Sequence, residues 1–252
     1  MHKIVVLAAL LTLGLGAGAV GAQQPGLRQT SQNLFTTPRP HSPTGLVVRT
    51  VYFNPTDPNG KPPAVRRIVT TFQPGTRFDT SVPAQCDVPR ALAGSCPPES
   101  KIGGGTITVD TGFPEPNRFL VNDTELVNMK DGFIFVTTDR KTGAKQANPA
   151  SIQGRTITAS VPPLPGTPPD GGALLTIRLT VNAITSGSGR NRRSFLTTPP
   201  TCPRSRRWTN RATFTYADGV TQTVGATMPC ARAARARQHR RRQHRSGPRF
   251  AG

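Results

Sequence analysis

A short segment near the middle of the chain, residues 86–105, restricts the possible fold more than any other feature. It contains two of the four cysteines, a Pro-Pro pair and three consecutive glycines. Segments with the pattern of β-strands precede and follow it. Inside it, Asp87 can cap one helical turn through Leu92, which Gly94 would end. We therefore predict a corner, pinned by a disulfide, in a secreted all-β domain.

The N-terminus has the pattern of a secretory signal peptide. Lys3 precedes an apolar run from Ile4 to Val20, and small residues occupy the third and first positions before a cut after Ala22. We predict cleavage there, and a secreted or cell-surface associated protein. An uncleaved anchor is the alternative. No later segment is apolar enough to span a membrane, so we predict no transmembrane segment after signal cleavage.

The four cysteines predict two disulfides in an exported chain. Three pairings are possible. We favour Cys86–Cys96 and Cys202–Cys230, because each pair brackets a compact segment. The competing interpretation is a zinc site, but the sequence has no Cys-x-x-Cys pair and no histidine near the cysteines.

Short alternating segments between glycine and proline turns determine the fold class. Residues 173–184 alternate apolar and polar side chains, as a half-buried strand does. Asp131-Gly132 and Asp218-Gly219 are strong hairpin signals. About ten such segments, and no long helix, predict an antiparallel β-sandwich, immunoglobulin-like or jelly-roll in outline, stapled by disulfides.

The same patterns divide the chain after residues 1–22, the signal peptide. Residues 23–44 are polar and proline-rich and predict an extended leader before the fold. Residues 45–230 form the β-sandwich domain, in which residues 139–149 are predicted to be a polar loop. Residues 231–252 form a disordered, arginine-rich tail.

Residues 96–105, C-P-P-E-S-K-I-G-G-G, resemble the C-P-x-x-S-x-[IV]-G-x-G signature of exported β-sandwich proteins of GC-rich Gram-positive bacteria. Pro74-Gly75 upstream of Cys86, and the closing segment 196–230, are similar to the same group. The resemblance covers about residues 66–230. It implies export, disulfides and the fold; no activity is assigned to these proteins, so it implies no site residues.

Histidine placement argues against one common class of catalytic site. No histidine lies between residues 45 and 230, so a nucleophile activated by histidine would require His41 to fold back. Asp110-Thr111-Gly112 is similar to the D-T-G of aspartic proteases, but that chemistry needs two carboxylates and the motif occurs once. We predict turn chemistry there, and no enzymatic activity, catalytic residue or cofactor.

Acidic residues keep two further hypotheses open. A glycoside hydrolase needs two carboxylates across a cleft, and a calcium site needs several oxygen ligands. The candidates for the carboxylate pair are Glu99, Glu115, Asp123, Glu125 and Asp131, and Asn122 joins the last three as a candidate calcium ligand. Their positions in the sequence do not predict that they converge, so we interpret them as solvated charges and predict no metal site.

The tail is the one segment that implies a partner. The chain has a net charge of +20, and its last 22 residues contain eight arginines and no acid. Such a segment attracts polyanions, and the attraction weakens with salt. The candidate partners are an anionic cell-wall polymer, lipid headgroups or extracellular nucleic acid without sequence-specific recognition. The candidate binding residues are Arg232, Arg235, Arg237, Arg240, Arg241, Arg242 and Arg245. A solubilising tail with no partner is the alternative.

Together these patterns predict an exported, non-catalytic structural or interaction module of the cell envelope, retained by anionic polymers through its basic tail. The alternative is a secreted carbohydrate-binding module or carbohydrate-active enzyme on a jelly-roll fold. One Trp and two Tyr offer few rings for stacking on sugars. Two acids that face one deep cleft would favour the enzyme.

Overall fold

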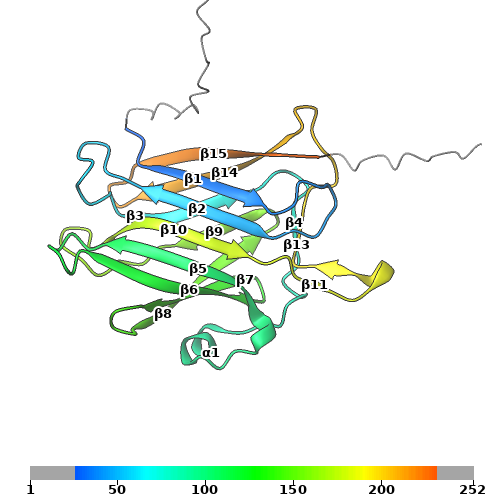
Figure 1. The fold of residues 1–252 in the computed structure, drawn as a ribbon, viewed down its shortest axis with the longest axis horizontal. Helices are drawn as coiled ribbons and strands as arrows, with labels where there is room; N and C mark the ends of the chain where they lie inside the picture. The colour runs from blue at the N-terminus through cyan, green and yellow to red at the C-terminus, as the bar shows by residue number, and fades with distance from the viewer. Residues whose placement is uncertain (1–25, 232–252) are drawn as a thin grey trace, which may run out of the picture.

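A computed structural model describes residues 26–231, which form an all-β fold (Figure 1). Half of the residues lie in strands and 6% in helices. Strands β1 to β5 span Gln29–Phe35, Leu46–Tyr52, Val65–Thr71, Arg77–Phe78 and Lys101–Asp110. Strands β6 to β10 span Phe119–Met129, Gly132–Asp139, Lys145–Gln153, Thr156–Ser160 and Ala173–Val181. Strands β11 to β15 span Thr185–Ser186, Arg193–Ser194, Leu196–Thr197, Arg207–Tyr216 and Thr221–Pro229. The helical segments are α1 (Val88–Ala93), η1 (Pro98–Ser100) and η2 (Gly189–Asn191).

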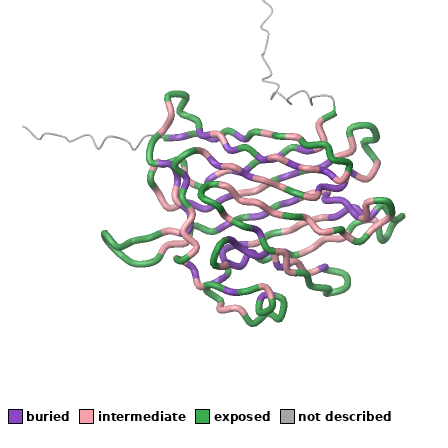
Figure 2. Tube along the Cα trace, turned by 180° about the vertical axis from the view of Figure 1, so that it is seen from behind, coloured by how far each residue is buried: buried purple, intermediate pink, exposed green. Residues whose placement is uncertain are grey.

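Eleven of these strands form one antiparallel sheet, in the order β1-β2-β10-β5-β6-β7-β8-β9-β3-β14-β15. The sheet curls into a near-barrel, so the two layers of the predicted sandwich are two halves of one sheet (Figure 1). Buried and exposed positions alternate along the strands, as Figure 2 shows. One set of side chains therefore fills the interior. The predicted all-β, antiparallel, disulfide-stapled fold is confirmed.

The two strands at the ends of this order, β1 and β15, meet without a backbone ladder in the described chain. Side chains join them instead. The amide of Phe35 donates to Met228 Sδ at 3.1 Å, and the amide of Arg28 donates to Gln222 Oε1 at 3.0 Å. From the neighbouring strand β14, Asn210 Nδ2 donates to the carbonyl of Asn33 at 2.7 Å. We call this junction the seam.

The triple glycine of β5 allows β10 to approach closely. A Cβ atom at Gly103 would collide with the carbonyl oxygen of Thr180, and one at Gly105 with that of Arg178. A bulge in the β5–β6 register lies between Lys101 and Gly103. A bulge and a close backbone contact are therefore both present, and they explain the glycines by sterics rather than by ligand binding.

Both predicted disulfides are present, and each borders a separate core. Cys202–Cys230 lies beside the main core inside the barrel, where Trp208 is completely buried. Cys86–Cys96 joins a smaller cluster in which α1 covers the outer face of β7 and β8. The predicted caps of α1 are confirmed, because Asp87 accepts from the amide of Arg90 and Gly94 adopts the left-handed conformation.

Two predictions about loops are wrong, and parts of the domain prediction lie outside the described residues. β1 lies within residues 23–44, so this segment is not wholly a leader before the fold. β8 begins within residues 139–149, where we predicted a loop. The signal peptide of residues 1–22 and the tail beyond Ala231 lie outside the described part of the chain.

Candidate functional site: cavities inside the barrel

The interior of the near-barrel contains two neighbouring cavities. The inner cavity has a volume of about 90 Å³ and the outer cavity a volume of about 310 Å³. Four residues line both of them, so the cavities adjoin. These shared residues are Ile68, Phe135, Ala159 and Ile177. Protein interiors of this size usually pack without voids larger than a water molecule. An adjoining pair of cavities is therefore the feature of this fold that most resembles a binding site.

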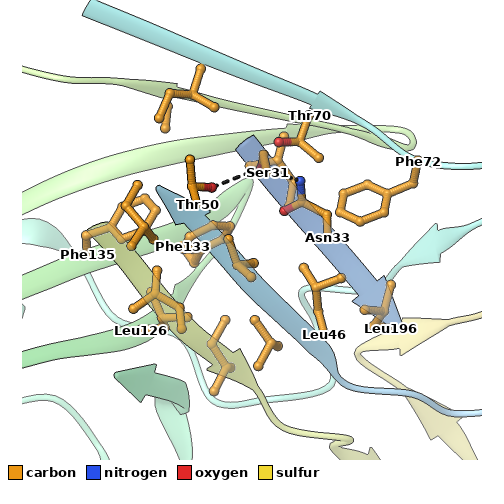
Figure 3. Close-up of a pocket in the computed structure, with 18 of the residues that line it drawn as sticks. Ser31, Asn33, Leu46, Thr50, Thr70, Phe72, Leu126, Phe133, Phe135 and Leu196 are labelled. Atoms are coloured by element: carbon orange, nitrogen blue, oxygen red, sulfur yellow. Dashed lines mark hydrogen bonds between the residues drawn. The ribbon is translucent and has the colours of Figure 1, made fainter. Parts of the chain in front are cut away.

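The inner cavity combines an apolar wall with a small polar group (Figure 3). Ser31, Asn33, Thr50 and Thr70 provide the polar group, from β1, β2 and β3. The hydroxyls of Ser31 and Thr50 are 2.9 Å apart, and Asn33 Nδ2 donates to Ser31 Oγ at 3.3 Å. All four side chains are buried. Ser31, Asn33 and Thr50 hydrogen-bond to one another, so these three side chains have little need of a polar ligand.

The outer cavity has an apolar floor and a polar rim. Its floor includes Val109, Leu174 and Ile177, which are all buried. Its rim includes Gln146 of β8, which is exposed, and Asn122 of β6, which is half-buried. The cavity lies at the end of the barrel where β5 and β7 finish and β6 and β8 begin. An apolar floor below a polar rim suits a ligand with one apolar end and one polar end.

Asp139, the last residue of β7, lines the outer cavity and is only 7% exposed. Its Oδ1 accepts hydrogen bonds from the amides of Lys141 and Thr142 and from the Thr142 hydroxyl, at 2.7 to 3.0 Å. Its Oδ2 has no hydrogen-bond partner among the described residues. Burial raises the pKa of this carboxyl, but the hydrogen bonds from Thr142 and Lys141 outweigh burial and hold the pKa below its ordinary value. The side chain is therefore an anion at neutral pH.

A proline-rich strap, residues 162–172, covers part of the outer cavity. Leu164 lies on the cavity wall and forms a β-bridge with Gly172, which closes the strap on itself. Lys61 Nζ holds the strap from outside, because it donates to the carbonyls of Thr167 at 3.0 Å and Gly171 at 2.6 Å. The strap is therefore anchored, and the cavity has a defined wall on this side.

The acids considered in the sequence do not converge at this cavity. Asp123 pairs with Arg140 at 2.7 Å and Glu125 with Lys101 at 2.6 Å, and all four side chains are more than half exposed on the outer face of the sheet. Asn122, the neighbouring position on β6, faces the interior instead. No group of three or more His, Cys, Asp or Glu side chains that could hold a metal occurs among residues 26–231.

The D-T-G motif has a structural explanation in its own loop. Asp110 is 1% exposed; its Oδ1 accepts from the amide of Gly112 at 2.9 Å, and its Oδ2 pairs with Arg118 at 3.2 Å. Thr111 accepts the amide of Phe113. These contacts close the β5–β6 turn. They account for the motif through turn chemistry.

Arg232 to Arg245, the arginines predicted to bind polyanions, lie outside the described residues, so their prediction is untested. The described chain nevertheless has exposed arginines where the tail begins. Arg204, Arg206 and Arg207 are exposed, and the amide of Cys230 donates to the carbonyl of Arg206 at 2.8 Å. The tail therefore starts beside a surface that is already basic.

Sequence reasoning missed the cavity, and the reason lies in its polar lining. Gln146 and Asn148 of β8 face the interior although they are polar, so β8 lacks the alternation that marks a half-buried strand. Ser31 and Asn33 of β1 are also polar and face the interior, so β1 lacks the same alternation. Polar side chains on the inner face of a strand indicate a cavity only after the strand order shows which face is the inner one.

Comparisons with known proteins identify no relative: no family model, no curated protein and no solved structure matches the chain. The resemblance of residues 96–105 to exported proteins of Gram-positive bacteria stays a prediction. Within the described residues, no helix is both long and apolar enough to cross a bilayer.

Proposed function

We propose that the protein is an exported, non-catalytic binding protein that holds a small, largely apolar ligand inside its barrel. The observation that carries this proposal is the outer cavity of about 310 Å³, whose floor is aliphatic. Ligand cavities in proteins begin at about this volume and are lined mainly by hydrophobic side chains. Apolar cavities that stay free of water take up apolar molecules. Closed or nearly closed β-barrels provide such interiors.

Two features favour this function over the carbohydrate alternatives. Trp208, Tyr52 and Tyr216 are the chain's only Trp and Tyr residues, and all three are buried. None of them offers an exposed ring on which a sugar could stack. The outer cavity also has a single carboxylate, that of Asp139, whereas glycoside hydrolysis uses two.

A neutral fluorescent dye, N-phenyl-1-naphthylamine, tests the proposal directly. We expect the protein to bind it with saturable fluorescence enhancement. Ala159 of β9 lines both cavities, so Ala159→Phe should fill the space and weaken dye binding at least tenfold. Thr158→Phe, on the opposite face of the same strand, is the matched control and should bind as the native protein does.

The melting temperature of each variant separates a filled cavity from a damaged fold. Phe side chains fit where a cavity already exists, so Ala159→Phe should unfold at about the native temperature. Dye binding that is unchanged in a folded Ala159→Phe protein would contradict the proposal, as would a native protein that does not bind the dye at all.

A second function is favoured by the exposed arginines where the tail begins. We propose that Arg204, Arg206 and Arg207, together with the tail, retain the protein on anionic polymers of the envelope. Removal of residues 232–252 should lower the salt concentration needed for elution from heparin without changing the melting temperature. Replacement of the three described arginines by Gln in the truncated chain should lower it further. Unchanged elution after truncation would remove this role.

A further inference from the structure

The outer cavity has one ionisable residue in its wall, Asp139, and this residue specifies the ligand further. The inference rests on the function proposed above. Asp139 is more than nine-tenths buried, and the hydrogen bonds to its Oδ1 come from its own turn. Its Oδ2 is buried and has no partner among the described residues. An oxygen of this kind is seldom left unpaired in a native protein.

The two cations next to Asp139 in the sequence are occupied elsewhere. Arg140 makes hydrogen bonds from Nε and Nη2 to the carboxylate of Asp123, at 2.7 to 3.1 Å, on the outer face of the sheet. Lys141 Nζ donates to Asn117 Oδ1 at 2.6 Å and makes a hydrogen bond to Asp139 only through its backbone amide, although its charge also helps to lower the pKa of Asp139 from a distance. No salt bridge within residues 26–231 includes Asp139. Buried charges are normally paired, and this one has no counterion within salt-bridge distance among the described residues.

We propose that the outer cavity binds a cationic amphiphile, whose protonated amine pairs with Asp139 and whose apolar chain covers the aliphatic floor. A primary ammonium group carries three donors. Oδ2 of Asp139 is closed to a molecule the size of water in this structure, so it accepts one of these donors when the carboxylate turns toward the cavity. The side-chain carbonyl oxygens of Asn122 and Gln146 on the same rim are available to the others. An amphiphile with a carboxylate head would meet the unpaired anion and be repelled. A neutral alcohol would satisfy one hydrogen bond but not the charge.

Because of the protein's net charge, a preference for an amine over a carboxylate would identify a local anion in the cavity. A chain with a net charge of +20 repels cations in general and attracts anions. Non-specific binding would therefore favour a fatty acid over a fatty amine. A preference for the amine can arise only from a local anion, and Asp139 is the one anion on the wall of the outer cavity.

Three ligands that share a ten-carbon chain test the proposal by competition with the dye. On the native protein, decylamine should bind about tenfold more tightly than decanol, and decanoate most weakly, because a charged hydrogen bond is worth more than about 1.4 kcal/mol. In Asp139→Asn, decylamine should lose its advantage over decanol. The variant keeps Oδ1 for the turn, so decanol binding itself reports whether the cavity is intact.

Asp123→Asn is the matched control, because Asp123 lies on the adjacent strand but faces outward and pairs with Arg140. It should keep the full preference for decylamine. Equal binding of decylamine and decanol to the native protein would overturn the proposed head group while the proposed function stands. Failure of the native protein to bind the dye would instead overturn the proposed function. The comparison on the native protein needs no variant, so it decides the matter even if Asp139→Asn does not fold.

Discussion

The two ends of the barrel differ in how they are filled. At one end, where β1 and β3 finish and β14 begins, the side chains of Phe35, Phe72 and Trp208 pack with ring centroids 5.7 to 5.9 Å apart. Phe78 and Phe195 continue this aromatic cluster, and with Phe72 they border the inner cavity of about 90 Å³. At the other end, aliphatic and amide side chains surround a cavity of about 310 Å³. We call these the aromatic end and the cavity end.

If the proposed function is correct, stability and binding belong to separate ends of the barrel. Aromatic pairs contribute both buried area and specific geometry, so the aromatic end can hold the sheet together. The cavity end leaves side chains without neighbours on one side and gives up dispersion contacts there. A fold whose aromatic end borders only the smaller cavity can tolerate such a loss at the other end.

The largest expected effect is at the aromatic end. Trp208→Ala should destabilise the protein by about 3 to 5 kcal/mol, because it removes the largest completely buried side chain and the indole hydrogen bond to the carbonyl of Thr201. Denaturant unfolding followed by circular dichroism measures the change. A loss below about 1 kcal/mol would show that the aromatic cluster does not determine stability.

The two disulfides should also differ in how much they stabilise the protein, and the one at the aromatic end should contribute more. Cys202–Cys230 borders the aromatic end and joins residues 28 apart, whereas Cys86–Cys96 joins residues 10 apart outside the barrel. The loop-entropy model assigns them about 3.6 and about 2.7 kcal/mol, respectively. The paired variants Cys202→Ser/Cys230→Ser and Cys86→Ser/Cys96→Ser avoid unpaired thiols, and denaturant unfolding compares them. The reverse order of stability would show that the smaller outer core matters more than the main one.

A pair of leucines compares the two ends with the same substitution. Leu196 is 1% exposed beside the aromatic cluster, and Leu174 is 6% exposed on the wall of the outer cavity. Leu→Ala changes cost about 2 to 5 kcal/mol in cores. Leu196 lines the inner cavity of about 90 Å³, whereas Leu174 lines the outer cavity of about 310 Å³. Leu196→Ala should therefore fall in the upper half of this range and Leu174→Ala near its lower limit, since Leu174 faces the larger empty space. Equal losses in free energy of unfolding would mean that the cavity end is packed as tightly as the other.

The smallest effect concerns acid pH and Asp139. Burial raises the pKa of Asp139, but the hydrogen bonds within its turn lower the pKa by more than burial raises it. The folded pKa therefore lies below the unfolded value. The resulting stability is present above the unfolded pKa of about 3.9 and is lost as the pH falls through the folded pKa. The stability difference between the native protein and Asp139→Asn should therefore shrink between pH 6 and pH 2. For Trp208→Ala, which removes no charge, the difference should stay constant over that range.

Much of the fold could be predicted from local rules. The disulfide pairs, the Asp87 cap and the Asp-Gly hairpins each depend on residues within one short segment, and all are present in the structure. The strands that escaped prediction, β1 and β8, have polar side chains on their inner faces. These side chains line the cavities. Pattern reasoning failed where the interior departs from an ordinary apolar core, and such departures are expected at functional sites.

The candidate site itself could not be predicted, for a related reason. Asp139 follows a strand and precedes a polar turn, so its sequence context is that of any exposed turn aspartate. The cavity that it lines is completed by β8 and by the strap of residues 162–172, which reach the same end of the barrel from later in the chain. Only the strand order brings them together.

The seam is the one line of the described barrel at which neighbouring strands are not held together by a backbone ladder. Neighbouring strands in a ladder keep a spacing of about 4.8 Å, because every backbone pair along their length enforces it. At the seam the backbones are bridged by long, rotatable groups such as Met228 and Gln222, which can follow the strands apart over a range of separations. Separation of β1 and β15 along this line would break side-chain contacts but no strand ladder, so we expect any widening of the barrel to occur here.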